Sequence, residues 1–139
     1  MNPDFTGGCL CGAVRYHAMQ MMRAGLCHCR MCQKASGAPV VAWLVVPITH
    51  FAITAGKPVA YRSSPKAFRR FCGACGTQLT FSVAKNPREV DINLATLDHP
   101  ETVEPQYHIY TSSRLPWLDI HDALPRFAEG RPTERAPTD

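Results

Sequence analysis

The chain has 139 residues, of which 45% are hydrophobic and 19% are charged, and its formal net charge is +4. This length suits a single domain with a buried core, and the composition is that of a globular protein rather than a disordered or fibrous one. Because no apolar run approaches the roughly 20 residues of a membrane span and the first ten residues lack a secretory-signal pattern, we expect a soluble, cytoplasmic protein without a membrane partner.

Most of the chain has the pattern of short β-strands, because twelve prolines and nine glycines divide it into short segments. Period-two alternation or β-branched apolar composition marks the strand segments. We expect strands in 10–18, 40–47, both sides of a turn at Gly56 within 51–62, 77–84 and 90–97. The Asn86-Pro87 pair predicts a turn between the last two of these.

Helical signals are few. A helical turn is expected after Cys29, and a helix in 115–128, opened by Pro116 and ended by Pro125. Residues 1–128 are predicted to form a single domain, and 129–139, EGRPTERAPTD, a flexible C-terminal tail. The prediction is a mainly β fold of several small sheets with little helix.

The seven cysteines fall into three groups, and their number and spacing favour metal binding over disulfides. An odd count in a protein expected to be cytoplasmic fits disulfides poorly, whereas closely spaced cysteines are typical of metal ligands. The groups are Cys9 and Cys11; Cys27, Cys29 and Cys32; and Cys72 and Cys75.

The sequence FCGACGT around Cys72 and Cys75 has the composition of a zinc knuckle. Gly73 and Gly76 allow the tight turn that brings both sulfurs to one ion. A redox CxxC motif is expected to lead from a strand into a helix, but this segment leads into a predicted strand. We therefore interpret the pair as metal ligands.

In each CxC pair, an extended backbone would direct the two cysteines to the same face. Cys9 and Cys11 can then converge on one ion, and so can Cys27 and Cys29. His28 would point to the opposite face, so we do not expect it to be a ligand and expect it bonded to backbone or exposed. Spacing alone leaves open which CxC pair joins Cys72 and Cys75.

The cysteine motifs together resemble the family of glutathione-dependent formaldehyde-activating enzymes, to which the centromere protein V group is related. The resemblance rests on GGCLCGAVRY at 7–16, CHCRMCQKASGAP at 27–39, FCGACGTQL at 71–79 and the Trp-containing segment at 107–127. It implies an Mss4-like fold, a set of small coiled β-sheets around a zinc ribbon. It also implies two zinc ions per chain, with Cys9, Cys11, Cys72 and Cys75 on a structural ion and Cys27, Cys29 and Cys32 on a second, open one.

The implied activity is that of a carbon–sulfur lyase of the S-(hydroxymethyl)glutathione synthase type, with a small thiol such as glutathione and a small aldehyde such as formaldehyde as partners. Three thiolates and Zn²⁺ sum to a net charge of −1, which makes the ion a poor activator of water but a good holder of another thiolate. Adding a substrate thiol to a small electrophile suits such a site.

Residues near the motifs are candidates for further roles. Gln33, Ser36 and Gly37 follow the third cysteine and could line its pocket or supply N–H groups. Trp43 and Trp117 are expected in the core, and no pairing among the other histidines is readable. Cations that could bind anionic substrate groups are Arg30, Lys34, Arg62, Lys66, Arg69 and Arg70.

The alternative is a zinc-ribbon module that binds nucleic acid or protein without catalysis. The basic residues do not form one run, and no aromatic-rich RNA-binding motif accompanies them. We therefore do not expect nucleic acid as a partner, and a structural ribbon would not explain a three-cysteine site.

Overall fold

The computed structural model describes residues 3–131 and contains, within that range, ten strands in two sheets with one α-helix. The smaller sheet has the order β1-β2-β5, formed by β1 (Asp4–Gly8), β2 (Arg15–Met19) and β5 (Phe51–Ala55). All its neighbouring strands are antiparallel. In β2, burial alternates along the strand, with Tyr16 and Ala18 facing the core, as expected for a half-buried strand.

The larger sheet has the order β10-β3-β4-β9-β8-β7-β6. Its strands are β3 (Arg23–Cys27), β4 (Val41–Pro47), β6 (Val59–Ser64), β7 (Ala67–Phe71), β8 (Gln78–Val83), β9 (Glu89–Asn93) and β10 (His108–Ile109). Neighbours are antiparallel except β10, which runs parallel to β3. The apolar strand β4, between β3 and β9, is buried over most of its length because Leu44 and Val46 pack in one core cluster and Val41 and Trp43 in another.

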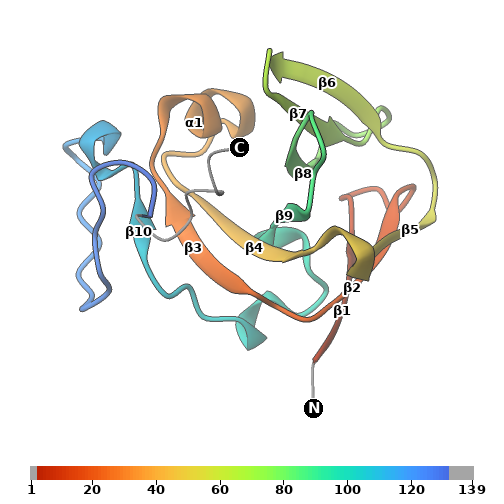
Figure 1. Ribbon diagram of the computed structural model, residues 1–139, viewed down its shortest axis with the longest axis horizontal. Helices are drawn as coiled ribbons and strands as arrows, with labels where there is room; N and C mark the ends of the chain where they lie inside the picture. The colour runs from red at the N-terminus through yellow and green to blue at the C-terminus, as the bar shows by residue number, and fades with distance from the viewer. Residues whose placement is uncertain (1–2, 132–139) are drawn as a thin grey trace.

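The helix α1 (Arg30–Ser36) follows β3 directly. Short 3₁₀ turns occupy η1 (Ile48–His50), η2 (Leu94–Thr96), η3 (Pro100–Thr102) and η4 (Thr111–Ser113). Figure 1 shows the larger sheet curving from β3 and β4 to β6 and β7, with the smaller sheet beside the end of β4 that is farther from α1.

The main core contains side chains from both sheets. Its fully buried members include Tyr16 from the smaller sheet and Leu44, Leu79 and Ile92 from the larger one. A second, smaller cluster contains Trp43 and two of the cysteines, and lies at the end of β3. The mainly β architecture predicted from sequence is confirmed.

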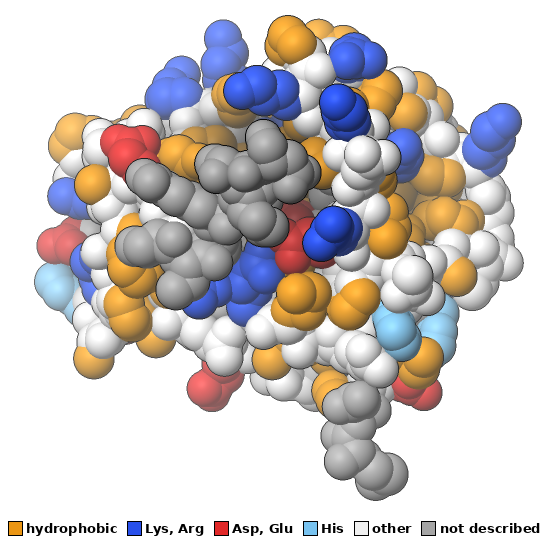
Figure 2. All heavy atoms as spheres, in the orientation of Figure 1, with side chains coloured by type: hydrophobic (Ala, Val, Ile, Leu, Met, Phe, Trp, Pro, Cys, Tyr) orange, Lys and Arg blue, Asp and Glu red, His pale blue; other side chains and the backbone are white. Residues whose placement is uncertain are grey.

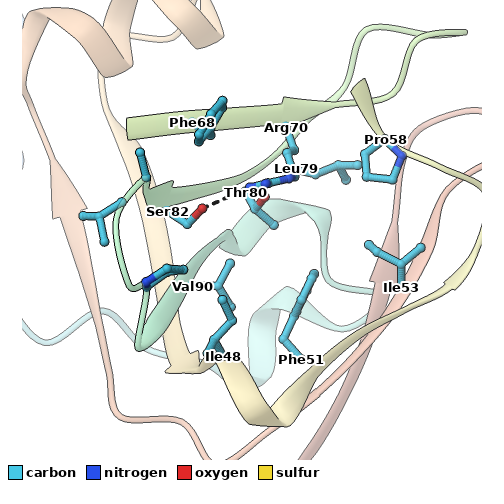
Figure 3. A pocket seen from close by; sticks show the side chains of 13 residues that line it. Ile48, Phe51, Ile53, Pro58, Phe68, Arg70, Leu79, Thr80, Ser82 and Val90 are labelled. Atoms are coloured by element: carbon cyan, nitrogen blue, oxygen red, sulfur yellow. Dashed lines mark hydrogen bonds between the residues drawn. The ribbon is translucent and has the colours of Figure 1, made fainter. Parts of the chain in front are cut away.

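A pocket of about 300 Å³ lies between β5 and the β7–β8 pair. Figure 3 shows Phe51, Ile53, Pro58 and Phe68 around it, with Arg70 extending toward Thr80 and Ser82. Nη1 of Arg70 donates to Oγ of Ser82 at 3.0 Å, so this cation is bonded to a hydroxyl of the mostly apolar pocket lining.

Several predicted elements differ in the structure. The strand expected over 10–18 is limited to β2, because Cys9 to Gly12 form a turn in which the Gly12 N–H donates to the Cys9 carbonyl. The strands β1, β3, β7 and β10 were not predicted. The Gly56 turn is present, but the strands on its two sides join different sheets.

The helix predicted over 115–128 is absent and that prediction was wrong. The Leu118 N–H donates to the Leu115 carbonyl in a turn, and two arginine side chains bind backbone carbonyls of the segment. Arg114 donates to Leu115 and Leu118, and Arg126 to Ile120, Asp122 and Leu124.

In the predicted tail, the Tyr110 N–H donates to the Glu129 carbonyl, and the Arg131 guanidinium lies 4.7 Å from the centre of the Tyr107 ring. The remainder of that tail, 132–139, lies outside the described residues. None of the helices in 3–131 is long and apolar enough to cross a membrane.

Candidate metal centres

The structure brings the seven cysteine sulfurs together in two groups, and within each group all sulfurs lie within 4.8 Å of one another. The four-cysteine group comprises Cys9, Cys11, Cys72 and Cys75, and the three-cysteine group Cys27, Cys29 and Cys32. These are the sets that the family resemblance implied. Among the described residues, both groups contain cysteines alone, with no His, Asp or Glu.

The four-cysteine group joins the turn after β1 to the turn after β7. The Sγ of Cys11 is 3.6 Å from that of Cys9 and 3.8 Å from that of Cys72. Between the two turns, the Leu10 N–H also donates to Oγ1 of Thr77 at 3.0 Å. The sulfurs converge through a turn and not through the extended Cys9–Cys11 backbone that we expected.

The turn after β7 is closed by its own backbone. Gly76 has a φ of 81°, a conformation suited to glycine, and its N–H donates to the Cys72 carbonyl at 2.8 Å. The Thr77 hydroxyl lies 3.2 Å from Sγ of Cys75, and because it accepts from Leu10 its own hydrogen can be donated to that sulfur. This contact and nearby backbone N–H groups lower the pKa of Cys75 to about 5, favouring the thiolate that a metal requires.

The three-cysteine group is formed by the end of β3 and the start of α1. Cys27 is the last residue of β3, and Cys29 is the N-cap of α1 with an extended backbone, as the CxC pattern predicted. The Sγ of Cys29 accepts a hydrogen bond from the Cys32 N–H at 3.2 Å. Cys27 and Cys32 are buried, while Cys29 is partly exposed.

The three thiols do not ionise independently. Hydrogen bonds from the Cys27 and Cys32 thiols favour the Cys29 thiolate and lower its pKa strongly. The same contact with Cys29 is the main cause that raises the pKa of Cys27, with burial adding to it. A bound cation would remove this competition, because it favours all three thiolates together.

Aromatic and apolar side chains surround the three-cysteine group. Cys27 and Cys32 pack with Val41 and Trp43, and Phe81 lies against this cluster. Trp43 is in the core, as predicted, and its ring centre is 6.4 Å from that of Phe81. Trp117, by contrast, is 71% exposed, so its predicted core position was wrong.

The candidate cations have different environments. Arg69 is buried, and its Nη2 donates to Sγ of Cys32 at 3.5 Å. Arg70, its neighbour on β7, faces the pocket of Figure 3. Arg30, Lys34, Arg62 and Lys66 are exposed.

His28 lies between two of the cysteines but on the other side of the backbone. Its Nε2 is 2.8 Å from Nδ1 of His108, and Nε2 of His108 is 2.9 Å from Oδ2 of Asp122. The hydrogen bond with His108 is the main cause that lowers the pKa of Asp122 to about 2. The His28 side chain is therefore buried against His108, whereas we expected it to be exposed or bonded to backbone. The two histidines are 80 residues apart, and the sequence carried no signal for their pairing.

The residues after Cys32 hold the loop through hydrogen bonds to backbone carbonyls. Nε2 of Gln33 donates to the carbonyls of His28 and Ser113, and Oγ of Ser36 donates to the Cys32 carbonyl. Gly37, with a φ of 73°, ends α1 by donating its N–H to the Gln33 carbonyl. These contacts fix Cys29 and Cys32 relative to β3.

The donor sets fit tetrahedral thiolate coordination. Sulfurs about 2.3 Å from a tetrahedral zinc ion lie about 3.8 Å apart, close to the separations in the four-cysteine group. Both groups could hold a metal ion, and the three-cysteine group would leave one coordination position free of protein ligands from the described residues.

The chain is similar to known proteins in fold and in sequence. A crystal structure of a Rhodobacter sphaeroides protein from structural genomics matches with a TM-score of 0.57 and 25% identity, over 72% of this chain and 91% of that chain. An uncharacterized lyase of Schizosaccharomyces pombe is 34% identical over 90 residues, which span 61% of this chain and 64% of that relative.

The match to the lyase therefore covers less than two thirds of that protein. The model of the family of glutathione-dependent formaldehyde-activating enzymes matches residues 4–113 and includes all seven cysteines. The fold is mainly β and Mss4-like, as the resemblance implied. The chain is a member of the glutathione-dependent formaldehyde-activating enzyme family.

Proposed function

We propose that the protein is a zinc-dependent carbon–sulfur lyase that adds a small thiol, with glutathione as the leading candidate, to formaldehyde or a similar small carbonyl compound. In this proposal the four-cysteine group holds a structural zinc ion and the three-cysteine group a second one. The family and the relative named as a lyase support the reaction class.

The observation that carries the proposal is the difference between the two cysteine groups. One has four sulfurs, which complete a closed structural site, whereas the other has three and no fourth protein ligand among the described residues. Zinc bound to the three cysteines would supply a cation that stabilises a substrate thiolate at neutral pH. A site that only stabilised the fold would have no need of the open position.

The apolar surroundings of the three-cysteine group would protect a bound thiolate from water. Cys27 and Cys32 are buried against Trp43, which limits access of bulk water. In the reaction the thiol loses its proton to solvent, its sulfur forms the C–S bond, and the carbonyl π-electrons move to oxygen, which takes a proton to give the hydroxymethyl product. Because thiols react readily with formaldehyde, orientation and thiolate formation are the main contributions required.

Charge near the site supports an anionic thiol such as glutathione. Exposed Arg30 and Lys34 lie on α1, the helix that begins directly after Cys29, whereas Arg62 contacts Phe68 on the other face of the sheet. Figure 2 shows basic side chains along the upper edge of the molecule, over the region where α1 and β6 lie in Figure 1. Such a field raises the local concentration of anionic substrates.

Exchange NMR of glutathione and formaldehyde at equilibrium tests the proposal, because it measures the rate of C–S bond formation with and without protein. We expect acceleration by the wild-type protein and none by Cys29→Ser. The absence of acceleration with glutathione, cysteine and 2-mercaptoethanol would refute the thiol-transfer activity.

A further inference from the structure

Arg69 is a buried cation whose hydrogen bonding is incomplete. Its residue exposure is 4%, Nη2 donates to Sγ of Cys32 at 3.5 Å, and Nη1 is buried with no hydrogen-bond partner. Within 3–131 it makes no ion pair with a carboxylate. Burying a guanidinium is unfavourable unless negative charge and hydrogen-bond acceptors compensate it. The three cysteine sulfurs are the source of negative charge beside it.

The position of Arg69 is fixed by the alternation of β7 and by aromatic packing. Phe68 and Arg70 face the pocket of Figure 3, and Arg69 between them faces the opposite side of the sheet. Its guanidinium carbon lies 5.1 Å from the centre of the Phe81 ring, and Phe81 packs against Trp43. The guanidinium is therefore held between an aromatic surface and the cysteine cluster.

The charge of the site gives this arrangement a function. Three thiolates with a divalent ion carry a net charge of −1. A substrate thiolate in the fourth position would make the net charge −2 in a largely buried site. The positive charge of Arg69 returns the total to −1. A neutral fourth ligand would need no such compensation, so Arg69 affects anionic ligands more than neutral ones.

Resting on the function proposed above, we propose that Arg69 makes the three-cysteine site selective for a thiolate as its fourth ligand. Its charge compensates the incoming negative charge, and its unpartnered Nη1–H is the donor available to that ligand. Arg69 is thus a specificity-determining residue of this site. A purely structural role would instead change metal uptake or the binding of all ligands equally.

Cobalt in the three-cysteine site, with zinc kept in the four-cysteine group, provides the assay. The probes are 2-mercaptoethanol, which binds as a thiolate and has no carboxylate, and imidazole, which binds as a neutral ligand. The sulfur-to-cobalt charge-transfer band reports thiolate binding, and the visible ligand-field bands report imidazole. The variants are Arg69→Gln, the charge-retaining Arg69→Lys, and the matched control Arg70→Gln on the opposite face of the same strand.

Removing Arg69 should alter the ratio of the two affinities. Because a hydrogen bond to a charged group contributes about 1.5–3 kcal/mol, we expect Arg69→Gln to weaken 2-mercaptoethanol binding about ten- to a hundredfold. Imidazole binding should change less than about threefold, since a neutral ligand adds no charge. Arg69→Lys should keep most of the thiolate preference, and Arg70→Gln should match the wild type.

Equal weakening of both ligands, or no weakening of either in Arg69→Gln, would overturn the inference and leave the proposed function standing. Failure of the wild-type cobalt protein to bind any thiol would overturn the proposed function, and the inference with it. If Arg69→Gln does not fold or load cobalt, Arg69→Lys decides the question. If Arg69→Lys keeps the wild-type ratio of 2-mercaptoethanol affinity to imidazole affinity, charge compensation is supported. If the ratio is lost, charge compensation is refuted.

Discussion

Replacing one cysteine in each group tests whether the two groups have different roles. Cys72→Ser removes a proposed zinc ligand whose side chain is 1% exposed and belongs to the main core, in a group where four sulfurs from two turns converge. Structural zinc contributes directly to folding free energy, so we expect a loss of about 4 kcal/mol or more. For a chain of this size that loss lowers Tm by roughly 12–16 °C.

Cys29→Ser is the matched control. Cys29 is partly exposed and caps α1 by accepting from the Cys32 N–H, and a serine hydroxyl can accept the same bond. We expect Tm to fall by no more than about 4 °C, corresponding to about 1 kcal/mol, with loss of one metal ion per chain. Thermal melts followed by circular dichroism, with elemental analysis of the same samples, measure both effects. Similar Tm losses in the two variants would refute the division into structural and substrate-binding groups.

Three further outcomes are expected. Elemental analysis should find two zinc ions per chain, one removable by mild chelation; a single ion with three alkylatable cysteines would contradict the two-site proposal. The Arg15 guanidinium, bonded to Asp98, and the Thr6 hydroxyl hold the pKa of that carboxyl well below its ordinary value. The pair therefore contributes stability above the unfolded pKa of about 3.9 that is lost as the pH falls below it, so urea midpoints should decline more steeply below about pH 4 in wild type than in Asp98→Asn. Trp43→Ala should cost about 3–5 kcal/mol in urea unfolding and Trp117→Ala less than about 0.5 kcal/mol, because only the first side chain is buried; comparable losses would contradict the packing.

Local patterns predicted the segments whose burial is regular. The apolar run that became β4 and the alternating segments that became β8 and β9 were recognisable because each places its hydrophobic side chains on a core. The helical turn after Cys29 was also predicted, and the structure extends it to the seven-residue helix α1. The fold class followed from these segments and from the family resemblance.

Other elements depend on contacts that local sequence does not encode. The strand β7 contains two adjacent arginines, and one of them, Arg69, is buried because the cysteine cluster lies beside it. The pairing of His28 with His108 joins residues far apart in sequence. The segment 115–128 had a plausible helical pattern, but Arg114 and Arg126 bind its carbonyls and hold it in a loop. The cysteine groups were implied by resemblance, and that they bind zinc stays a prediction.

Cadmium-113 NMR of the cadmium-substituted protein tests the central proposal most directly, because the chemical shift of cadmium depends on how many sulfurs bind it. We predict two resonances, one in the range of four-sulfur complexes and one in the range of three-sulfur complexes. Addition of glutathione should move only the second resonance into the four-sulfur range. A second resonance that does not respond to thiols, or a single resonance with Cys27, Cys29 and Cys32 open to alkylation, would contradict an open thiol-binding site.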